Sequence, residues 1–116
     1  MPANNSINYI EFPLKNSDAT IDFYSRAFGW TFTRWGDDYL SFEGAGIDGG
    51  FNGAGTAGIT TPGVLVVLYS SDLAKTEQAV SDAGGTLTQA TYDFPGGRRF
   101  HFKDPNGNEL AVWSEK

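Results

Sequence analysis

The chain has 116 residues, a net charge of −6 and no cysteine. This length indicates one domain, over residues 1–116, whose core can form without disulfides. The absence of cysteine excludes disulfides, thiolate metal sites and cysteine nucleophiles. The acidic balance argues against binding to nucleic acid, because phosphate binding requires a basic surface.

Membrane association and secretion are not expected from this sequence. The longest apolar run, residues 64–69, is far too short to cross a bilayer. The N-terminal MPANNS has neither the basic nor the apolar region of a signal peptide. We therefore expect a cytoplasmic protein.

The first half of the chain predicts a strand, a helix and three more strands. Residues 7–12 alternate, so that Tyr9 and Glu11 share one face of a strand. Asn16, Ser17 and Asp18 offer N-caps for the helix, and Gly29 suits its C-terminal end. The expected elements are a strand at 7–12, a helix to about residue 28, a hairpin of 30–34 with 39–42, and a strand at 47–51.

The same order begins again after a stretch of small residues. Its last part, FPGGRRFHFKDPNGNELAVW, contains two alternating runs around Asp104-Pro-Asn-Gly107 and predicts a β-hairpin. The expected elements are a buried strand at 64–69, a helix capped by residues 70–72 and ended by Gly84-Gly85, a strand at 86–91, and the final hairpin.

The repeated order indicates an α+β fold of two βαβββ modules. Module one is expected over about 6–52, a linker over about 53–62 and module two over about 63–116. A single half would leave an open, curved sheet with exposed edges, and pairing with a second half covers them. Because two halves still leave a concave face open, we predict a homodimer.

Several motifs resemble those of the glyoxalase/bleomycin resistance protein/dioxygenase superfamily, also known as vicinal oxygen chelate proteins. The resemblance covers nearly the whole chain. It implies paired βαβββ modules whose half-barrel sheets wrap a cleft, with small-molecule chemistry or binding inside. The residues that carry it are Ile21-Asp-Phe-Tyr24, Ala27-Phe-Gly-Trp30, Asp72-Leu73, Ala83-Gly-Gly85 and Phe102-Lys-Asp-Pro-Asn-Gly-Asn108.

Metal-dependent members of this superfamily use four ligand positions, usually His, Gln or Glu. The resemblance maps these positions to Tyr9, Asp48, Leu65 and Ala111. Divalent cations need carboxylate or imidazole ligands, and most of these residues supply neither. We therefore predict no metal cofactor, which argues against glyoxalase and extradiol dioxygenase activity; the alternative is a glyoxalase-like enzyme with a non-standard divalent metal site.

The resemblance also directs Tyr9, Ala111, Arg99 and His101 toward the cleft, and Phe100 and Phe102 under the helices. Alternation along the strands adds Glu11, Glu109 and Trp113. We expect these polar groups to orient an anionic or hydroxylated ligand, and Trp113 and Tyr9 to stack on its apolar part. The predicted ligand-binding residues are Tyr9, Asp48, Arg99, Glu109 and Trp113, and the candidate catalytic residues are Glu11 and His101.

Structural roles are the alternatives for the same residues. Arg99 could form a buried ion pair with Glu11 or Glu109. His101 could be a hydrogen-bonded structural histidine, and Trp113 could simply pack.

Three functions follow from the sequence. The first is a metal-independent protein that binds a small molecule, for which the acidic charge would favour cationic ligands and the aromatic residues flat ones. The second is a lyase or isomerase that uses Glu11 or His101 as a general base. The third is an interaction module with a vestigial cleft.

Overall fold

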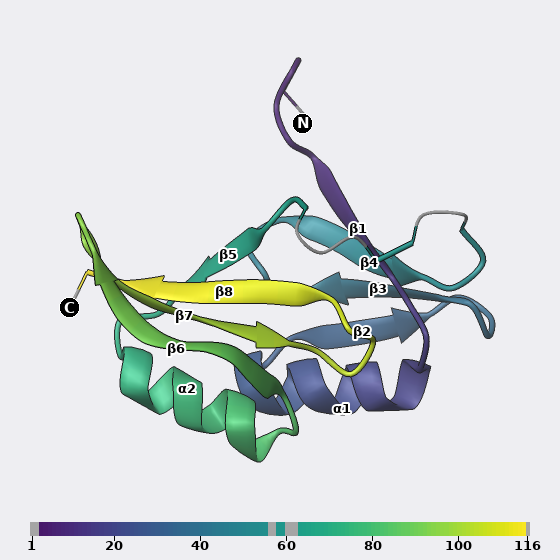
Figure 1. Cartoon of the computed structure of the whole chain (residues 1–116). Helices are drawn as coiled ribbons and strands as arrows, with labels where there is room; N and C mark the ends of the chain where they lie inside the picture. The colour runs from purple at the N-terminus through teal and green to yellow at the C-terminus, as the bar shows by residue number, and fades with distance from the viewer. Residues whose placement is uncertain (1–2, 56–57, 60–62, 116) are drawn as a thin grey trace.

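The computed structural model describes residues 3–55, 58–59 and 63–115. These residues form a strand, a helix and three strands, followed by the same order again (Figure 1). The α+β fold of two βαβββ modules predicted from the sequence is therefore confirmed. The elements are β1 (Tyr9–Pro13), α1 (Ser17–Phe28), β2 (Thr31–Arg34), β3 (Tyr39–Glu43), β4 (Asp48–Asn52), β5 (Val66–Tyr69), α2 (Leu73–Asp82), β6 (Thr86–Phe94), β7 (Gly97–Lys103) and β8 (Glu109–Ser114).

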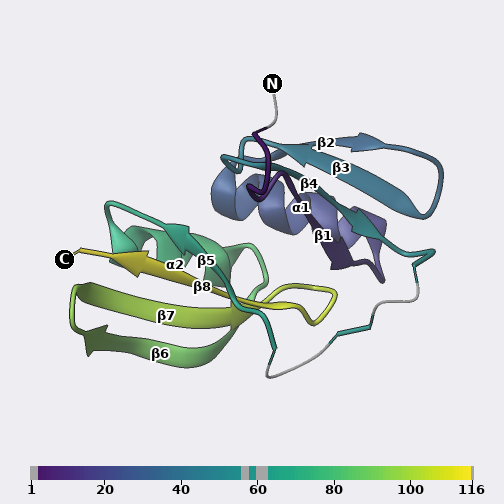
Figure 2. The ribbon, with the colours of Figure 1, turned by 90° about the horizontal axis from the view of Figure 1, so that it is seen from above.

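Each module forms its own four-stranded mixed sheet. The first sheet has the order β1-β4-β3-β2, and the second has the equivalent order β5-β8-β7-β6. In both, the first and last strands of the module pair in parallel, and the remaining pairs are antiparallel. The two sheets lie side by side (Figure 2), and β1 and β5 are each an edge strand of their sheet.

Local capping explains where the helices begin and end. The Asn16 side chain accepts a hydrogen bond from the backbone N–H of Ala19 at 2.9 Å, and Asp72 accepts one from Lys75 at 3.2 Å. Gly29 closes α1 with φ of 75°, a left-handed conformation in which glycine carries no Cβ penalty. The helix ends expected from the sequence agree with these caps.

One apolar core is shared by both modules. Tyr24 stacks on Trp30 with ring centroids 4.7 Å apart, and Trp30 stacks on Phe42 at the same separation. The second sheet adds residues from β7 and β8, of which Phe100 and Phe102 are fully buried, as predicted. We call the opposite side of each sheet, away from this core, its outer face.

The β7–β8 turn joins the second module to the first. Asn106 Oδ1 accepts hydrogen bonds from the backbone N–H groups of Lys15 at 2.7 Å and Asn16 at 3.1 Å, and Asn106 Nδ2 donates to Thr20 Oγ1 at 2.8 Å. Asn108 Nδ2 also donates to the carbonyl of Pro13 at 3.0 Å. The buried asparagines of the DPNGN motif therefore connect the two modules in this chain.

Two expectations about the strands need correction. The strand expected at 64–69 is not buried throughout: it begins at Val66, and the preceding Val64 is 95% exposed. The reason is that β5 is an edge strand with one face open. Strand β6 continues to Phe94 rather than ending at residue 91. Within the expected linker, residues 56–57 and 60–62 lie outside the described residues.

Candidate functional site

The outer face of the first sheet carries a hydrogen-bonded group around Glu11. Tyr39 donates to Glu11 Oε2 at 2.9 Å, and Asn52 Nδ2 donates to Glu11 Oε1 at 3.1 Å. The hydroxyl groups of Tyr9 and Tyr39 are hydrogen-bonded to each other. Because Tyr39 gives its proton to the carboxylate, Tyr9 is the donor in that pair. Both oxygens of Glu11 therefore have partners.

Gly50 makes room for this group. A Cβ atom at Gly50 would lie 2.7 Å from the hydroxyl oxygens of both Tyr9 and Tyr39. Partial burial, followed by the hydrogen bonds to Tyr9 and Glu11, raises the pKa of Tyr39 well above its ordinary value. Tyr39 therefore stays protonated as a donor. Asp48, directly opposite Tyr9 in the neighbouring strand, is exposed.

The outer face of the second sheet carries a second row of polar groups. Arg99 Nε donates to the hydroxyl of Tyr92, and that hydroxyl lies 3.1 Å from His101 Nε2. On the other side of the imidazole, Glu109 Oε2 is 3.7 Å from His101 Nδ1 and accepts a hydrogen bond from Thr88 Oγ1 at 2.8 Å. His101 is only 9% exposed.

These contacts form a row from Arg99 through Tyr92 to His101. A guanidinium can only donate, so the Tyr92 oxygen accepts from Arg99. The Tyr92 hydroxyl can donate its own proton to His101 Nε2, and the tautomer that accepts it carries its ring proton on Nδ1, facing Glu109. Both ring nitrogens of His101 therefore face protein groups.

Aromatic rings surround Arg99 on the same outer face. Its guanidinium carbon lies 5.5 Å from the centre of the Tyr92 ring and 5.6 Å from that of Phe94, within the range of cation–π attraction. Trp113 is directly opposite Arg99 in the strand register. The Trp113 ring centre is 5.3 Å from that of Tyr69 and 6.3 Å from that of Phe94.

The predicted site residues thus fall into two groups on different sheets. Tyr9, Glu11 and Asp48 belong to the first sheet, whereas Arg99, His101, Glu109 and Trp113 come together on the second. Among the described residues, Arg99 makes no ion pair with Glu11 or Glu109, so that alternative is wrong. The Tyr92 hydroxyl and the two rings take the place of a carboxylate partner.

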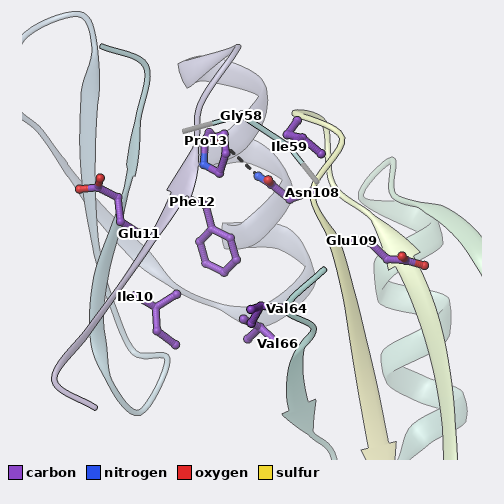
Figure 3. Close-up of a pocket in the computed structure, with 10 residues that line it drawn as sticks. All are labelled: Ile10, Glu11, Phe12, Pro13, Gly58, Ile59, Val64, Val66, Asn108 and Glu109. Carbon is purple, nitrogen blue, oxygen red and sulfur yellow. Dashed lines mark hydrogen bonds between the residues drawn. The ribbon is translucent and has the colours of Figure 1, made fainter. Parts of the chain in front are cut away.

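A pocket of about 300 Å³ separates the two groups. Both Glu11 and Glu109 lie at its border, but their carboxylates point away from it and away from each other (Figure 3). Its interior side chains are mainly apolar, including Ile10, Phe12 and Val66. A second pocket, of about 530 Å³, shares these three residues and runs along β5. Neither pocket contains the imidazole or the guanidinium.

The four family ligand positions do not fit a divalent cation. Asp48 offers one carboxylate and Tyr9 a phenol, whereas Leu65 and Ala111 have no donor atom in their side chains. Ala111 is also fully buried. In the part of the chain that the structure describes, no group of three or more His, Asp or Glu side chains could hold an ion.

The sequence did not identify Tyr39 and Tyr92, each of which connects the polar side chains within one of these two groups. Tyr92 was not expected in a strand, because the predicted strand ends at residue 91, whereas β6 continues to Phe94. The β6–β7 register also shifts twice between Leu87 and Tyr92, so simple alternation does not give the face of Tyr92. Tyr39 lies on the predicted hairpin, and its place opposite Asn52 could have suggested a shared face with Glu11. The parallel β1–β4 pairing that creates this contact is not visible from local patterns.

Comparisons with known proteins agree with the fold. The sequence model of the Glyoxalase/Bleomycin resistance protein/Dioxygenase superfamily matches residues 6–112. No curated protein matches the chain. Within the described residues, no helix has the length and apolar character needed to cross a bilayer.

Solved structures share this architecture at low sequence identity. A glyoxalase-related enzyme from Fulvimarina pelagi is 16% identical with a TM-score of 0.80, over 95% of this chain and 88% of that one. A glyoxalase/bleomycin resistance protein/dioxygenase family enzyme from Burkholderia phytofirmans PsJN is 19% identical with a TM-score of 0.77, over 94% and 98%. TioX from Micromonospora sp. ML1 is 18% identical with a TM-score of 0.73, over 97% and 100%. At these identities the likeness concerns the fold alone.

Proposed function

Because the chain belongs to the glyoxalase/bleomycin resistance protein/dioxygenase superfamily, we propose that it binds a small molecule on the outer face of its second sheet, without a metal. The observation that carries this proposal is the aromatic group of Tyr69, Phe94 and Trp113 beside the hydrogen-bonded row of Arg99, Tyr92 and His101. Apolar rings next to a few fixed polar groups are typical of ligand sites.

Binding is favoured over general-base catalysis by the state of the two candidate bases. Glu11 accepts one hydrogen bond on each carboxylate oxygen. His101 Nε2 is hydrogen-bonded to the Tyr92 hydroxyl at 3.1 Å, and Nδ1 faces Glu109 at 3.7 Å. A general base must reach the substrate proton within hydrogen-bond distance. Both groups are better suited to shaping a surface than to taking a proton.

We propose that no metal is needed, because of the side chains at the four ligand positions of the family. A cation at the family position would meet the side chains of Leu65 and Ala111, which cannot coordinate it. The ligand is therefore proposed to be held by hydrogen bonds and stacking alone.

We further propose that the protein is a homodimer in the cytosol. On one chain, the polar groups of the two sheets do not face each other, and apolar residues are exposed on both edge strands: Val67 is 40% exposed and Tyr69 is 55% exposed on β5, and Tyr9 is 44% exposed on β1. A second copy that covered these edges would also enclose the outer faces.

Thermal-shift screening of the purified chain against a small-molecule collection tests the binding proposal. A ligand at 100 times its Kd should stabilise the fold by about 2.7 kcal/mol. Trp113→Ala is expected to abolish the stabilisation, whereas Trp113→Phe, which keeps a ring, should retain most of it. EDTA should leave it unchanged.

Two results would contradict the proposal. Hits that respond equally to wild type and Trp113→Ala would place binding elsewhere. Hits that EDTA removes, together with stoichiometric metal in the purified protein, would show that a cation is required.

A further inference from the structure

Arg99 differs from the other arginines in this acidic protein. Arg26 pairs with Asp22 at 3.3 Å, Arg98 pairs with Asp93 at 3.0 Å, and Arg34 pairs with Asp18. Among the described residues, Arg99 alone of the four has no carboxylate within 4.0 Å. This holds although acidic residues outnumber basic ones by 14 to 8. Its contacts are the Tyr92 hydroxyl and two aromatic rings, so within the residues that the structure describes its positive charge has no opposite charge beside it.

The surroundings of Arg99 hold its guanidinium in one orientation. Nε is used by the Tyr92 hydroxyl, and the rings of Tyr92 and Phe94 flank the group at 5.5 and 5.6 Å. In the described part of the chain, no residue accepts a hydrogen bond from its two terminal amino groups. A guanidinium with these groups free presents a fork that matches the two oxygens of a carboxylate.

The acids beside this site have other partners. Glu109 is directed toward Thr88 at 2.8 Å and His101 at 3.7 Å, and Glu115 accepts a hydrogen bond from the Tyr69 hydroxyl. The row from Arg99 through Tyr92 and His101 to Glu109 thus separates the unpaired cation from the carboxylate at its other end. One unmatched positive charge suits a ligand with one negative charge.

The aromatic residues define the rest of the ligand. Trp113 lies opposite Arg99 in register, with Tyr69 beyond it on the neighbouring strand. On the single chain Tyr69 is 55% exposed and Trp113 is partly exposed, so the fold of one chain leaves both rings open to a ligand. A flat apolar group next to a carboxylate would stack on these rings while the carboxylate bound Arg99.

We infer that the ligand of this face is a planar aromatic or conjugated monocarboxylate, bound through the two terminal amino groups of Arg99. This inference rests on the function proposed above and names its ligand class. It departs from the cationic preference suggested by the overall charge, because the carboxylate beside Tyr69, that of Glu115, is engaged by the Tyr69 hydroxyl, whereas Arg99 has no carboxylate partner among the described residues.

Isothermal titration calorimetry with three matched probes tests it on the full chain. The probes are 1-naphthoate, neutral 1-naphthamide and cationic 1-naphthylmethylamine. Wild type is expected to bind the carboxylate about tenfold or more tightly than the amide, as for a hydrogen bond to a charged group. The cation should bind most weakly.

Two variants assign this preference to one residue. Arg99→Gln should reduce the carboxylate-to-amide ratio to about one. Arg98→Gln removes the same charge from the neighbouring position, where the side chain pairs with Asp93, and should leave the ratio within about twofold of wild type. The wild-type ratio stands as a test even if Arg99→Gln does not fold.

Each other outcome overturns the inference. Equal wild-type affinities for 1-naphthoate and 1-naphthamide would overturn the inference of a carboxylate ligand. If Trp113→Ala then abolished the binding of both probes, the proposed binding function would survive. Failure of all three probes, together with no hit in the thermal-shift screen, would reject both. If Arg99→Gln instead halved the mass in solution without affecting naphthoate, the anion would come from a second copy of the chain.

Discussion

Tyr24 shows how a single buried side chain ties local structure to stability. It lies on α1 with its ring in the core, and its hydroxyl donates to Asp104 Oδ2 at 2.8 Å across 80 positions of sequence. Burial, then the charge of Asp104 and this hydrogen bond, raises the pKa of Tyr24 well above its ordinary value of 10.0. Above pH 10 the folded state therefore keeps the phenol proton of Tyr24, which the unfolded state releases.

This pKa shift predicts a loss of stability in alkali. Below pH 10 the phenol is protonated in both states, so the stabilisation is fully present. As the pH rises above 10, only the unfolded chain ionises, and the free energy of unfolding should fall by about 1.4 kcal/mol per pH unit from this residue until the folded pKa is reached. Tyr24→Phe should lose this contribution, giving a smaller decrease between pH 9 and 11 in urea denaturation. Parallel decreases in both proteins would contradict the prediction.

At the scale of elements, the β7–β8 turn does more than reverse the chain. Gly107 has φ of 95°, which a side chain would strain, and so the turn itself needs glycine. Asp104, Asn106 and Asn108 are nearly fully buried, and among the described residues no buried side-chain polar atom lacks a partner. Such a satisfied network specifies how the two modules meet.

Asn106→Ala should therefore destabilise the protein strongly. The substitution removes the acceptor for two backbone N–H groups of the β1–α1 connection and the donor to Thr20. Since buried groups left without partners cost about 1–3 kcal/mol each, we expect a loss of about 2–4 kcal/mol in chemical denaturation. Asn8→Ala, at an exposed position, is the matched control and should change stability by less than about 0.5 kcal/mol. Equal effects of the two substitutions would mean that the turn is not a structural connector.

At the scale of the whole molecule, the two sheets present separate polar outer faces. Helices α1 and α2 contact each other, both sheets pack on one core, and the carboxylates of Glu11 and Glu109 point in opposite directions (Figure 3). A hollow lined by both groups, as expected from the sequence, is not enclosed within one chain. Two chains could enclose it by bringing the first sheet of one against the second sheet of the other.

Light scattering coupled to size-exclusion chromatography tests the predicted homodimer. At micromolar concentration the mass should be about 25 kDa, twice the 12.5 kDa of one chain. Dilution should lower the mass if the interface is small. A mass of one chain at every concentration would contradict the prediction, and any ligand site would then have to be completed by one chain alone.

Local sequence patterns were sufficient for most of the architecture. The alternation of Arg99 and His101 with Phe100 and Phe102, the caps at Asn16 and Asp72, and the turn at Asp104 to Gly107 depend on residues close in the chain. Period-2 patterns and capping hydrogen bonds act over a few residues and can therefore be read from the sequence.

The assembly of the candidate site was decided only by tertiary structure. Alternation correctly grouped Arg99 and His101 but could not reveal Tyr92, because irregular pairing between β6 and β7 brings it beside them. Alternation also could not show that Glu11 and Glu109 lie on faces that point in different directions, since the direction of each outer face depends on how the two modules pack. Strand periodicity fixes which side chains share a face, whereas contacts between residues 80 or more positions apart, such as Tyr24 with Asp104, fix where that face points.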